Sequence, residues 1–313
     1  MHTRHIGKSG LKVSSIGLGC NNFGFTIDAE QSREMVHYAL DAGITLFDTA
    51  PIYGKEWGLS ETILGDALGA RRQEAVIVSK FGMTRAMTVR DTSRSAILKD
   101  IEESLTRLKT DYLDVYMLHW PDANTPMGET LRALDDIIRS GKARYIGCCN
   151  LPAWQVVEAK WLSKTDKLHE FVVTQDEYSL INQGAKHKLL PALEQYGMGL
   201  MPYTPLANGL LTGKYTQESQ AIGDTRLSRN LWSMGDRYLT DANLQRAQRL
   251  TDFAAERDRS LLELAVSWLL AQPAVCSVIA GTTKLEQLKM NIDAGNWKLT
   301  AEEMQQIDEI CTG

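Results

Sequence analysis

The predicted fold is organised around one stretch, Thr45-Leu46-Phe47-Asp48-Thr49-Ala50-Pro51-Ile52-Tyr53-Gly54. A short apolar run ends in an aspartate, and a tyrosine follows five residues later on a segment that Pro51 and Gly54 turn. A carboxylate at the carboxyl tip of a strand, with a phenol on the next loop, suits proton chemistry. The plainer interpretation is that Asp48 caps the next helix and Tyr53 is a half-buried surface ring. The stretch alone does not choose between the two.

Seven further runs resemble this strand. They lack strict alternation of apolar and polar residues, which indicates strands buried on both faces. The eight predicted strands are Ile16–Cys20, Thr45–Asp48, Ala75–Lys80, Tyr112–His119, Ala143–Cys149, Phe171–Glu177, Gly199–Tyr203 and Val275–Ala280. Before them, residues 3–6 and 11–14 flank Gly7-Lys8-Ser9-Gly10, and these glycines predict an N-terminal β-hairpin.

Segments with helical spacing separate the strands. They are Glu30–Asp41, Ser60–Leu68 with Ser60 as N-cap, Ser93–Leu108, Gly128–Ser140, Pro152–Leu162, most of Gly184–Tyr196, Asp241–Asp258, Ser260–Leu270, Lys284–Asp293 and Thr300–Ile310. Alternating β and α segments favour a parallel sheet. Eight such units in 313 residues predict one closed (β/α)8 TIM barrel domain over residues 1–313, rather than an open doubly wound sheet.

One long stretch after the seventh strand, from about Asn208 to Thr240, has no periodic pattern. It is too long for a plain connector. We therefore expect a functional loop there, either a lid or a cofactor clamp.

The composition is ordinary for a soluble globular protein, with 43% hydrophobic and 23% charged residues. A net charge of −5 and a pI of about 5.8 give no bulk attraction for nucleic acid or an anionic membrane, so neither partner is expected. We also expect no signal peptide and no membrane span. The odd number of cysteines without metal-ligand spacing predicts reduced thiols, no metal site and a cytoplasmic location: Cys20, Cys148, Cys149, Cys276 and Cys311. Oligomeric state cannot be read from the sequence.

Polar residues gather at the predicted strand ends, where a TIM barrel carries its active site. They are Asp48, Lys80, His119, Asn150, Gln175 and Tyr203. Taken singly, Lys80 is more simply a surface lysine and His119 a satisfied core histidine. At successive strand ends, with Asp48 and Tyr53 beside them, they indicate a site.

The chemistry of such a set is consistent with proton transfer to a carbonyl oxygen. A phenol with a pKa near ~10 is a proton donor at neutral pH. An ammonium at Lys80 favours the phenolate, and a carboxylate at Asp48 keeps that ammonium charged. The set contains no nucleophile, metal cluster or phosphoryl-transfer residues, so another group must attack the carbon, and hydride from a nicotinamide is the natural choice.

Ten sequence motifs point to one family. They are Phe47-Asp48-Thr49-Ala50, Tyr53-Gly54, Gly58-Leu59-Ser60-Glu61, Leu64-Gly65, Ile77-Val78-Ser79-Lys80, Asp114-Val115-Tyr116-Met117-Leu118-His119, Gly141-Lys142-Ala143-Arg144-Tyr145-Ile146-Gly147, Gln175-Asp176-Glu177-Tyr178-Ser179-Leu180, Tyr203-Thr204-Pro205-Leu206-Ala207 and Gly209-Leu210-Leu211-Thr212-Gly213-Lys214-Tyr215. With them the chain resembles an aldo-keto reductase over nearly its whole length. The last set is similar to the bacterial and potassium-channel-β-subunit-like branch, which includes aryl-alcohol dehydrogenase-like members.

The resemblance implies reversible reduction of aldehydes and ketones by hydride transfer from NADPH. Tyr53 would be the general acid in reduction and the base in oxidation. Lys80 and Asp48 would tune its acidity, and His119 would orient the substrate.

The resemblance also implies cofactor-binding residues. The nicotinamide would rest against Tyr203, with its carboxamide held by Asn150, Gln175 and Cys149, where the family usually has serine. The other implied contacts are Cys20, Asn21 and Asp48; Thr204, Pro205, Leu206, Asn208 and Lys214 along the pyrophosphate; and Arg226, Gly281, Thr283, Gln287 and Asn291 on the adenosine and 2′-phosphate side. The resemblance favours NADP(H) as the cofactor. Another branch carries Lys and Arg where Gly281 and Gln287 stand, and their absence weakens the grip on a 2′-phosphate, so NAD(H) stays open.

The expected partner is a small carbonyl or alcohol substrate. Four tryptophans on loops, Trp57, Trp120, Trp154 and Trp232, either line an apolar pocket with Tyr53 and His119 or pack beneath long loops. The alternatives are an NAD(H)-dependent alcohol or sugar dehydrogenase and a cofactor-binding regulatory subunit with little activity. An isomerase using Lys80 as a Schiff base is disfavoured by the carboxylate beside it and by the long loop.

Overall fold

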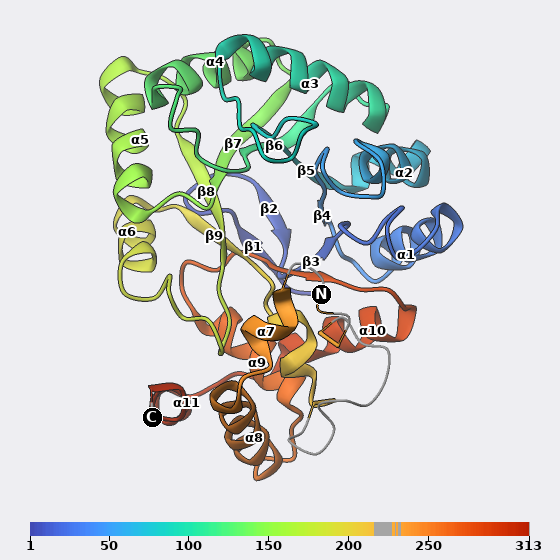
Figure 1. The fold of residues 1–313 in the computed structure, drawn as a ribbon, viewed down its shortest axis with the longest axis vertical. Coiled ribbons are helices and arrows are strands. Elements are labelled where there is room, and N and C mark those ends of the chain that lie inside the picture. The colour runs from blue at the N-terminus through green and yellow to red at the C-terminus, as the bar shows by residue number, and fades with distance from the viewer. Residues whose placement is uncertain (216–226, 229, 231–232, 313) are drawn as a thin grey trace.

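The chain forms a nearly closed barrel of eight parallel strands surrounded by helices (Figure 1), as predicted. The computed structural model describes residues 1–215, 227–228, 230 and 233–312. Around the barrel the strands follow the order β10 (Val278–Gly281), β3 (Ile16–Gly19), β4 (Leu46–Asp48), β5 (Val76–Phe81), β6 (Leu113–Leu118), β7 (Ala143–Cys149), β8 (Phe171–Glu177) and β9 (Gly199–Tyr203). A parallel bridge between Leu200 and Val275 brings β9 beside the segment that leads into β10.

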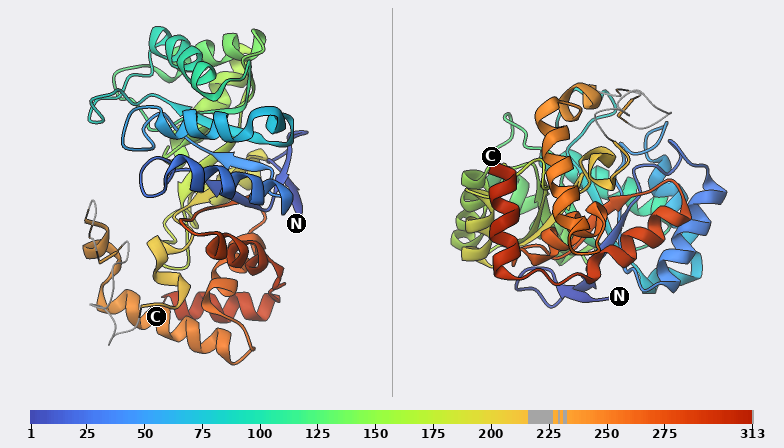
Figure 2. Two further views of the ribbon diagram at one scale, coloured as in Figure 1. Left: turned by 90° about the vertical axis from the view of Figure 1, so that its right-hand side faces the viewer. Right: turned by 90° about the horizontal axis from the view of Figure 1, so that it is seen from below.

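The predicted N-terminal hairpin is present and covers one end of the barrel. Its strands β1 (Thr3–His5) and β2 (Lys12–Ser14) pair antiparallel. Ile6 and Val13 are fully buried and belong to the apolar cluster inside the barrel. Figure 2 shows the hairpin in dark blue at the edge of the molecule, beside the N-terminus.

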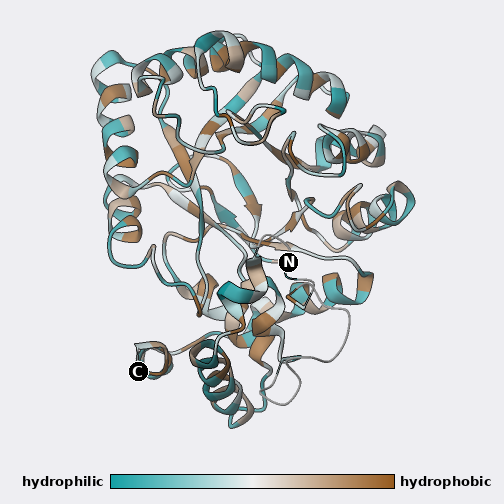
Figure 3. Cartoon of the chain, in the orientation of Figure 1, coloured by the Kyte–Doolittle hydropathy of each residue, from teal (hydrophilic) through white to brown (hydrophobic). Residues whose placement is uncertain are grey.

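The helices lie outside the strands, with apolar residues turned toward them and polar residues toward solvent (Figure 3). Their amphipathic faces supply the outer layer of the core. Their bounds are α1 (Ala29–Asp41), α2 (Leu59–Leu68), α3 (Arg94–Leu108), α4 (Met127–Arg139), α5 (Ala153–Asp166), α6 (Leu189–Tyr196), α7 (Met234–Tyr238), α8 (Asp241–Ala255), α9 (Leu261–Ala271), α10 (Leu285–Asp293) and α11 (Ala301–Thr312), with short 3₁₀ helices η1 (Gly69–Glu74), η2 (Ala207–Thr212) and η4 (Ala294–Asn296).

The expected N-cap of α2 and the expected start of the eighth strand were wrong. The N-cap of α2 is Gly58, with φ of 80°, and the Ser60 hydroxyl instead donates to the Cys20 carbonyl at 2.8 Å. Helix α6 covers residues 189–196, which is most of the segment expected to be helical, and Pro191, which lacks an N–H, lies in its first turn. The eighth strand begins at Val278, since residues 275–277 lie against β9 instead of β3.

The core has two layers, one inside the barrel and one between the barrel and the helices. Alternate residues of each strand enter each layer, so Leu46 and Val78 lie inside while Phe47 and Ile77 face the helices. Cys148 and Cys149 fall in different layers, as their adjacency on a strand predicted. Residues two positions beyond an inside residue face the barrel axis again, which directs Asp48 and Lys80 toward the axis at the carboxyl ends of β4 and β5.

Within the described part of the chain, no helix combines the length and the apolar composition needed to cross a bilayer.

Candidate active site

A buried lysine connects an aspartate and a tyrosine at the carboxyl ends of β4 and β5. Lys80 Nζ donates to Asp48 Oδ1 at 2.6 Å, to the Thr49 carbonyl at 3.0 Å and to Tyr53 Oη at 3.3 Å. Lys80 is 0% exposed and Asp48 3% exposed, whereas Tyr53 keeps part of its surface open. The structure therefore brings three of the four predicted catalytic residues into one hydrogen-bonded group.

The loop after β4 folds back so that the Tyr53 side chain reaches the end of β5. Tyr53 N donates to the Ala50 carbonyl at 3.0 Å, and the Ser60 N–H donates to the Tyr53 carbonyl at 3.1 Å. Gly54 adopts φ of 106°, a conformation that favours glycine. Backbone hydrogen bonds thus fix Tyr53 through both its N–H and its carbonyl, and the second of them comes from α2.

The fourth residue, His119, follows β6 and lies beside the phenol. The backbone N–H of His119 donates to the Phe81 carbonyl at 3.0 Å. Its ring meets the Tyr53 ring edge-on, with centroids 6.0 Å apart and planes at 84°. On its other side it stacks on Trp120, with centroids 3.9 Å apart. Burial, and then the charge of Lys80, hold the pKa of His119 well below its ordinary value, so the imidazole is neutral at pH 7.

Burial dominates the acidity of Tyr53. It raises the pKa of Tyr53 to about 12, because it outweighs the opposing effect of the Lys80 ammonium. The lysine does favour the phenolate, as its position predicted, but the net result is a phenol that stays protonated. Burial also disfavours the ammonium of Lys80, yet the charge of Asp48 overcomes this and raises the pKa of Lys80 above its ordinary value. The lysine is therefore a permanent cation.

Two amides at the ends of β7 and β8 extend this network. Gln175 Nε2 donates to Asp48 Oδ1 at 2.9 Å. Asn150 Nδ2 donates to the His119 carbonyl at 2.9 Å, and Asn150 Oδ1 accepts from the Tyr203 hydroxyl at 2.9 Å. Asn150 has φ of 59°, a left-handed conformation that asparagine tolerates. The side chains predicted to hold a carboxamide thus lie together with Asp48, Lys80 and His119, and buried Cys149 lies on the same inner layer.

The backbone after β9 is suited to an anionic ligand. Thr204, Ala207, Asn208 and Gly209 all have positive φ. Lys214 is exposed and forms no ion pair with the described residues, and a Cβ at Gly209 would lie 3.1 Å from its Nζ. An unpaired ammonium beside half-exposed backbone can bind a phosphate. Together with the partly exposed ring of Tyr203, these residues fit a nicotinamide dinucleotide.

The residues predicted for the adenosine side lie around the start of α10. Gln287 Oε1 accepts from Thr283 N at 3.0 Å, and Asn291 is buried. A Cβ at Gly281 would lie 2.7 Å from Asn21 Oδ1, which leaves no room for the longer side chain that another branch carries there. The Asn21 oxygen is buried and has no hydrogen-bond partner among the residues that the structure describes. Arg226 lies outside the described residues.

The predicted tryptophans are divided among several surroundings. Trp120 stacks on His119 as described above, and Trp57 Nε1 is buried without a hydrogen-bond partner. Trp154 was expected on a loop, but it lies in the first turn of α5 and is 64% exposed. A helix start after Pro152 explains this difference. Trp232 lies outside the described residues.

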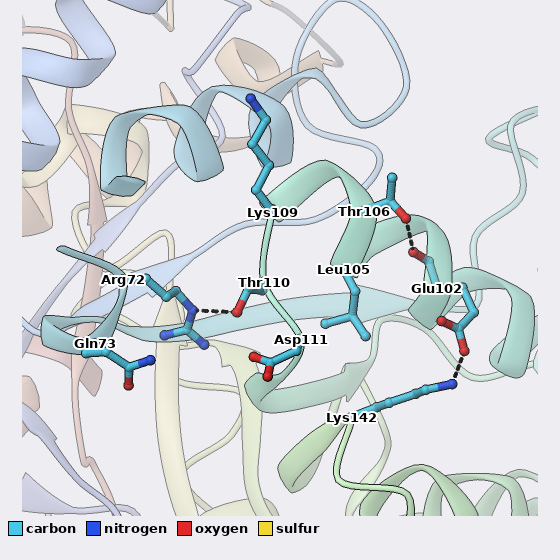
Figure 4. Close-up of a pocket in the computed structure, with 9 residues that line it drawn as sticks. All are labelled: Arg72, Gln73, Glu102, Leu105, Thr106, Lys109, Thr110, Asp111 and Lys142. Atoms are coloured by element: carbon cyan, nitrogen blue, oxygen red, sulfur yellow. Dashed lines mark hydrogen bonds and ion pairs between the residues drawn. The ribbon is translucent and has the colours of Figure 1, made fainter. Parts of the chain in front are cut away.

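Two open cavities lie at the other end of the barrel, where the strands begin. The first, about 730 Å³, is lined by Arg72, Gln73, Glu102, Leu105, Thr106, Lys109, Thr110, Asp111 and Lys142 (Figure 4). Its three cations are already paired, Arg72 with Asp114, Lys109 with Asp66 and Lys142 with Glu102. The second, about 710 Å³, lies by the N-terminal hairpin and includes Leu11 and Tyr145. Neither contains a predicted site residue.

Sequence reasoning missed two residues that shape the site. Thr49 contributes its carbonyl to Lys80, which no side-chain pattern announces. The Ser60 hydroxyl lies 2.9 Å from Thr49 Oγ1 and also reaches the end of β3. Its position in the motif Gly58-Leu59-Ser60-Glu61 was a usable signal, but the motif was interpreted as a helix cap. Among the described residues, no group of three His, Cys, Asp or Glu side chains is placed to hold a metal ion.

Comparison with known proteins agrees with this geometry. A model of the Aldo/keto reductase family matches residues 15–312. A probable voltage-gated potassium channel subunit beta from Oryza sativa subsp. japonica is 35% identical over 300 residues, covering 94% of this chain and 91% of that protein. L-glyceraldehyde 3-phosphate reductase from Escherichia coli strain K12 is 35% identical over 321 residues, covering 99% and 92%. An uncharacterised oxidoreductase, YrpG of Bacillus subtilis strain 168, is 32% identical over 324 residues, covering 100% and 97%. The chain belongs to the Aldo/keto reductase family, whose members are oxidoreductases acting on carbonyl compounds.

Proposed function

We propose that this protein reduces aldehydes or ketones with NADPH, using Tyr53 as the proton donor. One observation carries the proposal: a fully buried Lys80 ammonium contacts both Asp48 and the hydroxyl of Tyr53. A structural ion pair has no need of a partly open phenol as third partner. A proton donor needs both the phenol and the cation.

Each residue has a distinct role in the proposed reaction. Tyr53 donates its proton to the carbonyl oxygen, and Lys80 stabilises the phenolate that remains. Asp48 keeps Lys80 charged within the barrel. The neutral imidazole of His119 donates a hydrogen bond to the same oxygen and orients the carbonyl. Bound NADPH would supply the hydride, and Asn150, Gln175 and Tyr203 would orient its nicotinamide ring.

The choice between NADPH and NADH depends on cations near the 2′-phosphate. Lys284, exposed at the N-cap of α10, and Arg226 favour NADPH. Gly281 and Gln287 offer no positive charge, which keeps NADH as the second candidate. The helix start adds a weaker attraction for phosphate that does not depend on a cation.

The relatives suggest two kinds of role. One is named for reduction of L-glyceraldehyde 3-phosphate and another as a channel subunit. The complete group of Asp48, Tyr53, Lys80 and His119 favours an active enzyme over a subunit that only binds cofactor. L-glyceraldehyde 3-phosphate and an apolar aromatic aldehyde are therefore the first substrates to try.

The first experiment is a titration of tryptophan fluorescence with NADPH and with NADH. The chain has seven tryptophans, and we expect quenching at lower NADPH than NADH concentration. A panel of carbonyl compounds, including the two aldehydes above, then tests turnover by loss of absorbance at the nicotinamide band. Quenching without turnover of any carbonyl would favour the regulatory-subunit alternative, and absence of both would refute the proposal.

A further inference from the structure

A carboxylate at the end of β8 fixes the short helix α7 to the barrel. Glu177 Oε2 accepts from Arg237 Nη2 at 2.7 Å, and Glu177 Oε1 accepts from the Tyr238 hydroxyl. The Glu177 side chain is 12% exposed, and Tyr238 is buried. Among the described residues, these are the only hydrogen bonds between α7 and a strand. We call these three residues the α7 anchor.

The α7 anchor lies beside the surface proposed to bind the cofactor. Glu177 is the ladder partner of Tyr203 on the neighbouring strand β9. Helix α7 also packs against η2, the segment after β9 in which Asn208 lies (Figure 1). The pKa of Tyr203 is raised by burial first and then by the charge of Glu177, with Arg237 opposing, so both charges act on the Tyr203 hydroxyl. Helix α7 thus packs against the predicted pyrophosphate segment, and the carboxylate that holds it lies beside the predicted nicotinamide platform on the neighbouring strand.

Helix α7 has little stability of its own. It has five residues and no side-chain cap, and an isolated helix of this length does not form in water. The preceding Asn230 and Ser233 have φ of 44° and 56°, a left-handed conformation that is unfavourable for residues other than glycine. Gly235 lies so close to the Leu227 carbonyl that a Cβ would be 2.6 Å from the oxygen. Tertiary contacts must therefore hold α7 in place, and the α7 anchor supplies an ion pair between this helix and β8.

We propose that Glu177 is a positioning residue for the cofactor: through Arg237 and Tyr238 it holds α7 against η2, next to Tyr203, and this anchoring slows dissociation of the dinucleotide. The inference rests on the proposed function. It assigns Glu177 no part in proton or hydride transfer, since it contacts neither Tyr53 nor Lys80. Its effect should accordingly be on cofactor residence and not on the chemical step.

The test compares Glu177→Gln with Asp236→Asn. Glutamine keeps the size of the side chain but loses the charge that binds two donors. We expect the NADPH dissociation rate, measured by stopped-flow displacement, to rise about tenfold in Glu177→Gln, while the single-turnover rate of hydride transfer stays within twofold. Asp236→Asn makes the same change of charge in the same helix, but within the described part of the chain Asp236 bonds only Asn230. It should leave both rates within twofold of wild type.

A second readout needs no cofactor. Hydrogen exchange of a peptide covering residues 233–239 should be about tenfold faster in Glu177→Gln, with α10 unchanged as internal reference. Tyr238→Phe, which removes one donor and leaves Arg237, should give a smaller increase in both exchange and dissociation.

Each outcome decides between the hypotheses. A dissociation rate within twofold of wild type in Glu177→Gln would overturn the inference, and so would unchanged exchange. If wild type binds neither NADPH nor NADH, the proposed function fails, and the exchange experiment still tests the anchoring of α7 by itself.

Discussion

Strand β5 has a buried ion pair at each end, and the two pairs differ in what surrounds them. At its start, Arg72 Nη2 lies 2.9 Å from Asp114 Oδ2, with side chains 10% and 13% exposed. At its end, Lys80 Nζ lies 2.6 Å from Asp48 Oδ1, with side chains 0% and 5% exposed. The first pair joins η1 to β6, and the second joins β4 to β5.

The remaining partners separate a structural pair from a functional one. Arg72 donates otherwise to the Ala75 and Tyr112 carbonyls and to the Thr110 hydroxyl, and Asp114 also accepts from the Ile77 N–H. None of these carbonyl, hydroxyl and amide groups gains or loses a proton near neutral pH. Lys80 contacts Tyr53 instead, a titratable side chain that is still partly open to solvent. Burial of charge is therefore weak evidence for a site, and contact with a group that can exchange a proton is strong evidence.

Tyr53→Phe should give the largest effect on catalysis. Loss of a positioned general acid lowers reaction rates by about 10²–10⁴-fold, and we expect kcat/KM for carbonyl reduction to fall by that amount. Phenylalanine retains the ring, so the NADPH Kd should stay within twofold. Steady-state kinetics with the best aldehyde and a fluorescence titration measure the two quantities. If Tyr53→Phe reduces aldehydes at near the wild-type rate, the Lys80–Asp48 pair is no more functional than the Arg72–Asp114 pair at the other end of β5.

Arg72→Met should affect stability and not catalysis. The change leaves Asp114 as an unpaired, largely buried carboxylate and removes donors from two carbonyls. Breaking a buried pair from one side costs about 3–5 kcal/mol, and we expect that decrease in the free energy of unfolding from urea titrations. Below the unfolding transition, kcat should equal that of wild type.

Lys80→Met is the matched change at the other end of β5. It also leaves a buried carboxylate, so its stability should fall by a similar amount, but its kcat should fall as well. If Arg72→Met lowers kcat as much as Lys80→Met does, the two pairs are not functionally different.

Asp176→Asn tests whether every perturbed carboxyl near the mouth serves catalysis. Asp176 lies on β8 next to Gln175, and its side chain accepts a hydrogen bond from the Thr174 hydroxyl at 2.6 Å. Burial raises the pKa of Asp176 to about 7, with the bond from Thr174 opposing. Because the folded state binds this proton more tightly than the unfolded state, the contribution to stability is complete below about pH 4 and is lost as the pH rises through 7.

Asparagine carries no charge to bury, so Asp176→Asn should be more stable than wild type at pH 8. The difference in the free energy of unfolding between Asp176→Asn and wild type should be roughly 2–3 kcal/mol smaller at pH 5 than at pH 8. Denaturation at both pH values measures it. Reduction rates at pH 7 should not change, because Asp176 faces away from Lys80 and Tyr53. An equal advantage at both pH values would mean that the side chain does not titrate in this range.

The sequence allowed the barrel and the proximity of Asp48 and Lys80 to be predicted, because both follow from regular spacing. Strand periodicity places Asp48 two residues after Leu46 and Lys80 two residues after Val78, on the same inner layer. It could not give contacts that depend on loop geometry. The Thr49 carbonyl, the Ser60 hydroxyl and the α7 anchor are all of that kind. Strand periodicity also could not show whether burial or the Lys80 ammonium dominates the pKa of Tyr53. That depends on how much solvent the folded loop excludes.

Cys149→Ser should give the smallest effect. It should strengthen NADPH binding and lower the stability of the cofactor-free protein. Cys149 is 1% exposed, and burial raises the pKa of its thiol, so it is a neutral, weak hydrogen-bond donor. A serine hydroxyl would bind a carboxamide more strongly by about 0.5–1 kcal/mol, which predicts a Kd for NADPH two- to fivefold lower. Without cofactor the hydroxyl has no partner, and burying it should lower stability by about 1 kcal/mol.

Cys148→Ser is the control for this change. Cys148 is the preceding residue on β7 and faces the helices instead of the barrel axis. Its serine variant should show no gain in NADPH affinity. An equal gain in both variants would show that the position of Cys149 at the barrel axis is irrelevant, and no gain in either would remove Cys149 from the cofactor contacts. A gain confined to Cys149→Ser would place the carboxamide on the inner face at the end of β7, next to Asn150 and the catalytic group.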